Sequence, residues 1–305
     1  MITAGIDVGG TKIEAQIFND SFELVSKNRC DSPNSYDALV DAIADQMRWV
    51  EAQAGERLPI GIGSAGIIDP NTGIALTANL PASGRALPKD VAEKAGRGVT
   101  FVNDCRAVAL SEAVFGAGRG HSTVISLVLG TGVGGGVTIG QRLFNGPTCT
   151  GGEFGHIAAA AHVVRAHDLP LFPCGCGRIG CVETYISGPG LVRLAKHLTD
   201  AELTSSQIAA RRHAETAEVW DIWCALAAEL IHALTVTIDP DVIVLGGGIS
   251  RIEGVADDLM KAAKARQMGS FGSPPIVIAQ GGDASGARGA AYAAWQEANF
   301  QGTDA

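Results

Sequence analysis

The feature that most constrains the fold of this chain is a motif of strand, glycine-rich turn and strand that occurs twice. Residues 2–18 alternate apolar side chains around Asp7-Val-Gly-Gly-Thr-Lys12, and the apolar run 123–129 leads through the glycines of 130–136 into a second run at 137–139. Apolar runs joined by glycine turns are typical of β-hairpins. The chain has 305 residues, enough for one large or two medium domains.

Between and after these hairpins, strand and helix patterns alternate. Helical spacing of apolar residues predicts helices, whereas short apolar runs bounded by turn residues predict strands. The last helix is expected to pack on the first domain. Strands are predicted at 60–67, 99–102, 242–245 and 275–279, and helices at 35–54, 107–114, 217–238 and 286–295.

Composition narrows the class of protein. Hydrophobic residues make up 46% and charged residues 18%, which is ordinary for a soluble globular protein. The net charge of −9 and the lack of a basic patch argue against a nucleic-acid partner. We find no apolar run near the ~20 residues of a membrane span and no signal peptide. The seven cysteines in such a chain then indicate a cytoplasmic protein.

One stretch carries a metal-ligand pattern. Cys174, Cys176 and Cys181 have x1 and x4 spacing, and His156 lies upstream. Three thiolates and an imidazole match a closed structural zinc site without a position for water. Ordinary buried thiols, disulfides and a core histidine are the alternatives, but the intervening glycines favour a tight knuckle. The site would hold Glu153 and Glu183 in place as acceptors for a hydroxyl-rich ligand such as a sugar.

The glycine turns can bind phosphate. The segment 130–135 fits G-x-G-x-x-G, but the next segment is β-like, which disfavours a dinucleotide fold because that fold needs a helix there. Backbone N–H groups of such a turn can form an anion-binding nest. A nucleoside can lie against the glycines that end strand 242–245, unless they form only a turn into a helix. These nucleotide-binding candidates are Gly130, Thr131, Gly132, Gly134, Gly246, Gly247 and Gly248.

The first glycine turn carries an acid. Asp7 would repel a bare phosphate, so its place among glycines is explained if Mg²⁺ lies between them. Thr11 and Lys12 can donate to phosphate oxygens, and Gly9 and Gly10 allow the close approach. The alternative is an ordinary glycine hairpin with a solvated aspartate.

Asp104 is the candidate general base. It follows the predicted strand 99–102, where a carboxylate can accept the proton of an attacking hydroxyl during phosphoryl transfer. The alternative is that Asn103 and Asp104 only cap the following helix.

Taken together, these motifs resemble the ROK family of sugar kinases, within the actin/hexokinase-like ATPase superfamily. The resemblance implies an α/β, ribonuclease H-like two-domain ATPase fold with a cleft between the domains. A smaller N-terminal domain is expected over 1–117 plus 287–305, and a larger one with the zinc site over 118–286. The motifs follow the family's order: 7–12, 103–104, 129–135, 153–156, 174–183, 239–248 and 286–291.

The resemblance also implies roles for these residues. Asp104 would be the general base, and His156 would bind both sugar and zinc. ATP, Mg²⁺ and a structural Zn²⁺ are the expected cofactors, and a homodimer is the expected assembly. The implied sugar-binding set is Asn79, Asn103, Asp104, Glu153, His156 and Glu183.

Two segments favour N-acetyl-D-glucosamine, phosphorylated at its 6-hydroxyl, as the substrate. They are 78–87 and the long gap between His156 and Cys174, which resemble family members that act on this sugar. Ala65 and Arg106 depart from the family pattern near the sugar. Glucose and N-acetylmannosamine remain alternative substrates. A sugar-sensing regulator and an actin-like assembly protein are alternatives of other classes, but regulators of the family carry a DNA-binding segment before the first hairpin.

Overall fold

The computed structural model describes residues 3–300 and divides into two compact units. The first unit contains residues up to 119, together with 136–151 and 280–300. The second contains 120–135 and 152–279. This division differs from the sequence-based boundaries chiefly at 136–151 and 280–286, which those boundaries assigned to the second domain.

The first unit is built on a five-stranded sheet in the order β3-β2-β1-β4-β7. Strands β1, β4 and β7 are parallel, and β2 and β3 continue the sheet as antiparallel neighbours. The predicted N-terminal hairpin is confirmed as β1 and β2. The strand predicted over 60–67 ends at Ser64, and the chain then forms the short hairpin β5–β6. The bounds are β1 Thr3–Val8, β2 Lys12–Phe18, β3 Leu24–Asp31, β4 Ile60–Ser64, β5 Ile67–Ile68, β6 Ala75–Leu76 and β7 Thr100–Asn103.

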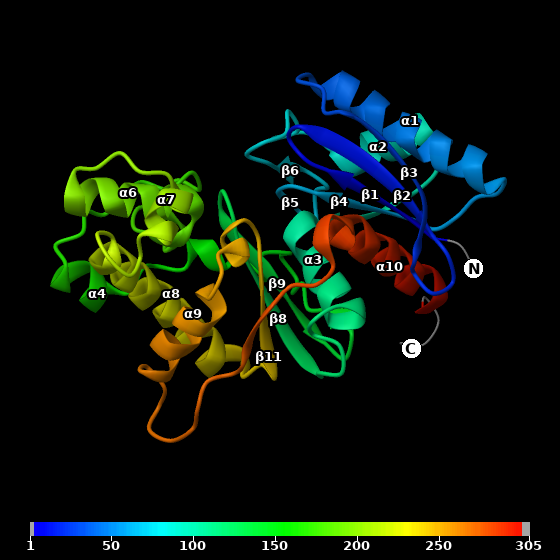
Figure 1. Ribbon diagram of the computed structural model, residues 1–305. Helices are drawn as coiled ribbons and strands as arrows, with labels where there is room; N and C mark the ends of the chain where they lie inside the picture. The colour runs from blue at the N-terminus through cyan, green and yellow to red at the C-terminus, as the bar shows by residue number, and fades with distance from the viewer. Residues whose placement is uncertain (1–2, 301–305) are drawn as a thin grey trace. The chain divides into compact units, whose positions relative to one another are not determined.

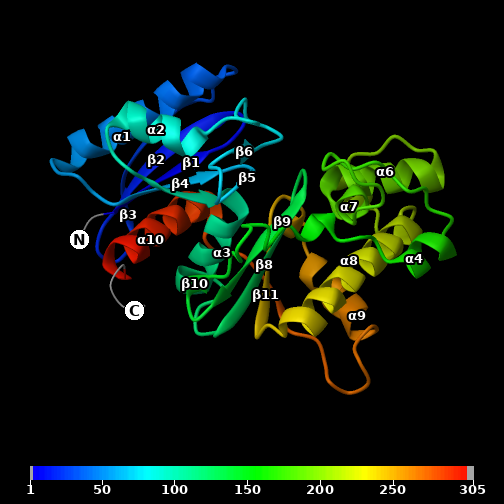
Figure 2. The ribbon, with the colours of Figure 1, turned by 180° about the vertical axis from the view of Figure 1, so that it is seen from behind.

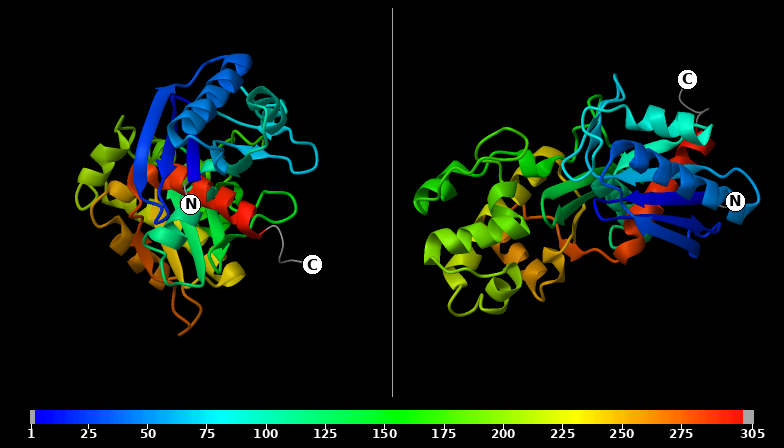
Figure 3. Two further views of the ribbon diagram at one scale, coloured as in Figure 1. Left: turned by 90° about the vertical axis from the view of Figure 1, so that its right-hand side faces the viewer. Right: turned by 90° about the horizontal axis from the view of Figure 1, so that it is seen from above.

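Helices cover this sheet, with α10 in direct contact with its backbone (Figure 1). A Cβ atom on Gly5 of β1 would lie 1.8 Å from the carbonyl oxygen of Ala287, and one on Gly61 of β4 would lie 1.8 Å from that of Ala290. Only glycine permits this approach. Figure 3 shows the red α10 beside the blue N-terminal strands. The helices are α1 Tyr36–Ala54, α2 Leu87–Ala95, α3 Asp104–Phe115 and α10 Ser285–Phe300.

A fully buried carboxylate joins three parts of the first unit. Glu112 on α3 accepts hydrogen bonds from the N–H groups of Ala117, Gln280 and Gly281 at 3.1, 2.9 and 2.7 Å. The hydroxyl of Ser285, the first residue of α10, donates to it at 2.9 Å. The chain leaves the first unit after Arg119 and returns for the last time at Gln280. Glu112 therefore binds both the departing and the returning segment.

The second sheet has the order β10-β9-β8-β11-β12, in which β8, β11 and β12 are parallel. Strand β9 begins at Val133, so the expectation that this strand starts at Val137 was wrong. The physical reason is close packing, because a Cβ atom on Gly135 would lie 2.1 Å from the carbonyl oxygen of Ser126 on β8. The bounds are β8 Thr123–Leu129, β9 Val133–Ile139, β10 Arg142–Leu143, β11 Val242–Gly246 and β12 Ile276–Ile278.

The second unit's helices gather around α8, which has the predicted bounds Ala217–Ile238 (Figure 2). α8 is long and apolar enough to cross a membrane, contrary to the expectation that no run is. Half of that apolar stretch is buried within the protein, as in the core helices of many globular proteins. The other helices are α4 Ala161–Ala166, α5 Glu183–Ile186, α6 Gly188–Thr199, α7 Ser205–Ala210 and α9 Val255–Lys264, with 3₁₀ turns at Phe154–His156, Ile249–Arg251 and Gly282–Ala284.

Candidate active site

In the first unit, the candidate residues lie at the carboxyl ends of parallel strands. Asp7 is the next-to-last residue of β1, and Asn103 ends β7. A Cβ atom on Gly10, in the turn after β1, would lie 2.8 Å from the backbone oxygen of Asn79. The fold therefore brings the first glycine turn and the predicted sugar contact Asn79 together. Parallel strands present their carboxyl ends at one edge, where ligands of α/β proteins commonly bind.

Asn103, and not Asp104, is the side chain that caps α3. The Asn103 side chain caps α3 by accepting a hydrogen bond from Arg106 N at 3.2 Å. Asp104 is the first residue of the helix, and its Oδ1 accepts from Cys105 N at 2.8 Å. Because Asn103 supplies the helix cap, that role does not account for the Asp104 carboxylate.

The pKa values of Asp7 and Asp104 are both raised. Burial raises the pKa of Asp104 above its usual value. Burial also raises the pKa of Asp7 to about 6, and the charge of Asp104 adds to the effect, while Lys12 opposes it. Two neighbouring, half-buried carboxylates make a site that favours a cation or a proton. This arrangement suits a Mg²⁺ ion associated with nucleotide phosphates: Asp7 would face the ion, and Thr11 and Lys12 would face the phosphates.

The raised pKa predicts how Asp7→Asn alters stability. A carboxyl whose folded pKa exceeds its unfolded pKa stabilises the fold only at low pH, and this contribution is lost as pH rises from about 4 through about 6. Without ligand, Asp7→Asn should therefore be more stable than wild type at pH 8, by about 3 kcal/mol at most, and by only about half as much at pH 5, which lies midway between the two pKa values. Urea unfolding at both pH values measures this. Asp45→Asn, on an exposed part of α1, is the control, and an equal gain at pH 5 would contradict the assignment.

In the second unit, the two glycine segments lie side by side. Gly247 has a φ of +84°, and a Cβ atom there would lie 2.3 Å from the carbonyl oxygen of Leu129, the last residue of β8. The segment 246–248 leads into a 3₁₀ turn, as the alternative interpretation expected. Residues 130–134 and 246–248 thus form adjoining glycine-rich surfaces, which allow a nucleotide to approach the backbone closely.

Glu183 connects the glycine segment 130–134 to the cysteine cluster. Its Oε2 accepts the N–H of Val133 at 2.8 Å, and its Oε1 lies 3.5 Å from Cys174 Sγ. The Glu153–His156 turn is also close to β9, because a Cβ atom on Gly155 would lie 2.3 Å from the oxygen of Val133. The second unit therefore holds Glu153, His156 and Glu183 around the start of β9.

The predicted zinc ligands come together. The donor atoms of His156, Cys174, Cys176 and Cys181 all lie within 4.8 Å of one another. Cys176 Sγ and Cys181 Sγ are 3.6 Å apart, close to the ~3.8 Å that Zn–S bonds of about 2.3 Å require in a tetrahedron. The knuckle is closed by hydrogen bonds from Cys174 N to Arg178 O and from Gly177 N to Cys174 O. The donor set and spacing fit a structural Zn²⁺.

His156 can serve the metal and a ligand at once. Its Nδ1 lies 3.5 Å from Cys174 Sγ, on the side of the cluster. The imidazole has a second nitrogen, Nε2, at the opposite side of the ring. A metal on one nitrogen fixes the protonation of the other, so Nε2 can donate a hydrogen bond to a sugar hydroxyl.

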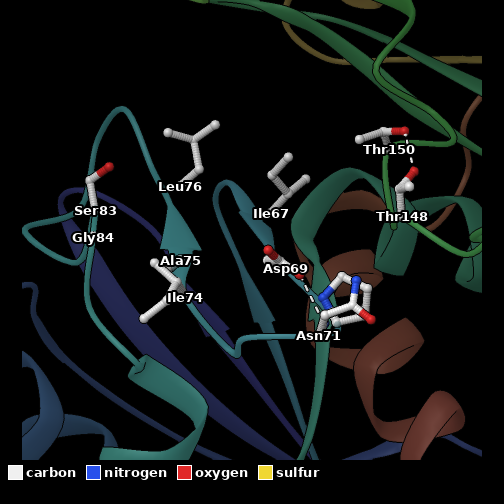
Figure 4. Close-up of a pocket in the computed structure, with 11 residues that line it drawn as sticks. Ile67, Asp69, Asn71, Ile74, Ala75, Leu76, Ser83, Gly84, Thr148 and Thr150 are labelled. Carbon is white, nitrogen blue, oxygen red and sulfur yellow. Dashed lines mark hydrogen bonds between the residues drawn. The ribbon is translucent and has the colours of Figure 1, made fainter.

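The structure also contains a cavity that the sequence did not indicate. It measures about 600 Å³ and lies within the first unit between the β5–β6 hairpin and the loop that carries Thr148 and Thr150 (Figure 4). We call it the β5–β6 cavity. Ile67 and Leu76 give it an apolar side, and the two threonine hydroxyls are 2.8 Å apart. The flanking glycines 146 and 151–152 were the only sequence signal for this loop.

The two five-stranded sheets, together with the glycine-rich segments 130–134 and 246–248, make this an actin-like ATPase fold. Its structure superposes on the ROK hexokinase of Thermus thermophilus with a TM-score of 0.87 and 30% identity, covering 98% of this chain and all of that one. A ROK family glucokinase from Streptomyces griseus, solved with glucose and AMPPNP, gives 0.78 and 30%, covering 97% and 100%.

The sequence comparisons lead to the same class. The model of the ROK family matches residues 3–297, and the chain belongs to this family. It is 40% identical to the N-acetylgalactosamine kinase AgaK of Shewanella sp. (strain ANA-3), covering 94% of both chains. It is 38% identical to the N-acetyl-D-glucosamine kinase of Photobacterium profundum, covering 94% of this chain and 97% of that one.

Proposed function

We propose that this protein is an ATP-dependent kinase that phosphorylates the 6-hydroxyl of an N-acetylhexosamine, with N-acetyl-D-glucosamine as its substrate. The observation that carries the proposal is the Asp104 carboxylate, which lies half-buried at the start of α3 and has a raised pKa. Such a carboxylate can take a proton from a hydroxyl near neutral pH. Curated relatives that span 94% of the chain and are named as N-acetylhexosamine kinases support the sugar class.

The residues have separate roles in this proposal. Asp104 accepts the proton of the attacking 6-hydroxyl. Asn79, Asn103, Glu153, His156 and Glu183 hold the other sugar hydroxyls. The glycines of 130–134 and 246–248 bind ATP, and Thr11 and Lys12 donate to its phosphates. Mg²⁺ would neutralise phosphate charge during transfer, and Asp7 is the residue that faces it.

N-acetylgalactosamine is the second candidate substrate, because AgaK has the higher identity of the two relatives. The two sugars differ only in the orientation of the 4-hydroxyl. A site that pairs a hydroxyl with buried polar groups discriminates strongly against a sugar that leaves these groups unpaired. We therefore expect one of the two sugars to be clearly preferred.

The substrate assignment predicts the outcome of an ATP-coupled assay on four sugars. N-acetyl-D-glucosamine should have the highest kcat/KM, ahead of N-acetylgalactosamine, N-acetylmannosamine and glucose. Glucose should still react, because an apolar contact to the acetamido methyl contributes only ~1–3 kcal/mol. NMR of the product should locate the phosphate on the 6-oxygen. A higher kcat/KM for N-acetylgalactosamine would transfer the assignment to that sugar, and turnover of glucose alone would reject the N-acetylhexosamine class.

Structural zinc is also part of the proposal. Metal analysis should find about one zinc per chain, and Cys176→Ser should lose most of it. Because Glu153 and Glu183 depend on the knuckle for their positions, activity should fall roughly 10–100-fold. Cys30→Ser is the control, since Cys30 lies on β3, outside the cluster. Unchanged sugar affinity in zinc-free protein would contradict the supporting role.

We further propose that the protein acts in the cytoplasm as a homodimer and binds neither nucleic acid nor membranes. The absence of a basic patch supports the first exclusion. Gel filtration with light scattering tests the dimer.

A further inference from the structure

Arg106 is a buried cation close in sequence to the proposed site. It lies on α3, two residues after Asp104, and only 4% of its surface is exposed. Its Nε donates to the carbonyl oxygen of Gly151 at 2.8 Å, and its Nη2 donates to that of Cys149 at 2.6 Å. A Cβ atom on Gly136 of β9 would lie 3.4 Å from Arg106 Cγ, so the stem of the side chain is packed as well.

Asn103, the N-terminal cap of α3, binds the hairpin on the side of the β5–β6 cavity opposite the loop 148–151. Asn103 Nδ2 donates to the carbonyl oxygen of Gly66, immediately before β5, at 2.8 Å. Gly66 has a φ of +97°, and a Cβ atom there would lie 2.3 Å from Leu76 O, so the hairpin cannot easily shift at this point. Asn103 thus fixes the hairpin side of the cavity, while Arg106 fixes the loop side.

We propose that Arg106 is a positioning residue for the sugar site, which fixes the loop 148–151 at a set distance from the β5–β6 hairpin. This inference rests on the proposed function. Thr148 and Thr150 of that loop line the cavity, and Glu153 follows Gly151 by two residues in the chain. The guanidinium suits this role, because its planar donors reach two carbonyl oxygens at once, whereas a lysine ammonium is a single point.

Arg106→Ala and Arg106→Lys test the proposal. The expected result for Arg106→Ala is a kcat/KM for the sugar lowered at least ~10-fold, mainly through a higher sugar KM, because a displacement of about 1 Å in a positioned group can cost as much as 10² in rate. The KM for ATP should change less than about two-fold. Arg106→Lys should have a smaller effect and partly restore sugar affinity. Amide hydrogen exchange at 148–151 should be faster in Arg106→Ala.

Arg97→Ala is the matched control. Arg97 also lies in the first unit and donates to a backbone carbonyl, that of Leu58 at 2.6 Å, with a side chain 16% exposed. It has no contact with the cavity or with the loop 148–151 among the described interactions of the chain. Its removal should lower stability and leave sugar KM within about two-fold of wild type.

The results separate this inference from the proposed function. If wild-type protein neither binds nor phosphorylates any N-acetylhexosamine in calorimetry and assay, the proposed function is rejected and this inference with it. If wild-type protein is active but folded Arg106→Ala keeps a wild-type sugar KM, only the positioning role is overturned. Unchanged exchange at 148–151 in Arg106→Ala, or an equal rise in sugar KM in Arg97→Ala, also overturns it. If Arg106→Ala does not fold, sugar KM and hydrogen exchange at 148–151 are measured on Arg106→Lys instead, and the same outcomes apply.

Discussion

Asp104→Asn should reduce kcat by ~10²–10⁴ while sugar affinity stays within a few-fold of wild type. Asparagine keeps the oxygen that accepts the N–H of Cys105, so the first turn of α3 should be preserved. It cannot accept the proton of the attacking hydroxyl, so the loss should fall on the chemical step. Steady-state kinetics with N-acetyl-D-glucosamine, together with calorimetric sugar binding, separates the two effects.

The control for this substitution is Asp37→Asn. Asp37 also lies in the first turn of a helix, α1, but its side chain is 94% exposed. Both substitutions remove one negative charge near a helix N-terminus, where acidic side chains contribute only ~0.3–1 kcal/mol. Near-wild-type kcat in folded Asp104→Asn protein would remove Asp104 from the role of base.

Glu112→Ala should lower the free energy of unfolding by about 3–5 kcal/mol. The substitution leaves the N–H groups of Ala117, Gln280 and Gly281 without their acceptor inside the protein. Each unsatisfied buried donor costs roughly 1–3 kcal/mol, and the site cannot admit water freely while it stays packed. Urea unfolding should show a lower midpoint with an unchanged slope.

Glu112→Gln provides a graded comparison. Glutamine keeps one acceptor oxygen but turns an NH₂ group toward N–H donors, so we expect a loss smaller than that of alanine but well above about 1 kcal/mol. Glu93→Gln, on a 67%-exposed side chain of α2, is the control and should change stability by less than about 0.5 kcal/mol. A loss below about 1 kcal/mol for Glu112→Ala would show that these hydrogen bonds contribute little.

The sequence alone was sufficient for the fold, the family and the class of enzyme. These predictions are confirmed because they rested on local signals: glycine turns between apolar strands, and a helix at 217–238 whose bounds are matched by α8. The joining of His156 to three cysteines was also predicted, since ligand spacing is a local property of a knuckle. The roles of the individual site residues stay predictions.

Other features were not predictable from the sequence. Strand β3 is an edge strand of mostly polar residues that alternate between exposed and half-buried positions, and β5 and β6 have two residues each, too few for any periodicity. The binding of Arg106 to carbonyl groups 43 and 45 residues away depends on tertiary folding. Arg106 was visible in the sequence only as a departure from a family pattern.

Because α10 packs directly on the backbone of β1 and β4, the first sheet cannot complete its packing until the end of translation. Strands β1 and β4 are made early, yet Gly5 and Gly61 lack the helix that covers them until residues 285–300 have been translated. At bacterial or eukaryotic elongation rates, the nascent sheet waits roughly 15–60 s, time in which exposed strands can pair wrongly. The whole second unit is synthesised during that interval. The part that is translated first is therefore the part that is completed last, and it is where a nascent chain of this protein would most need a chaperone.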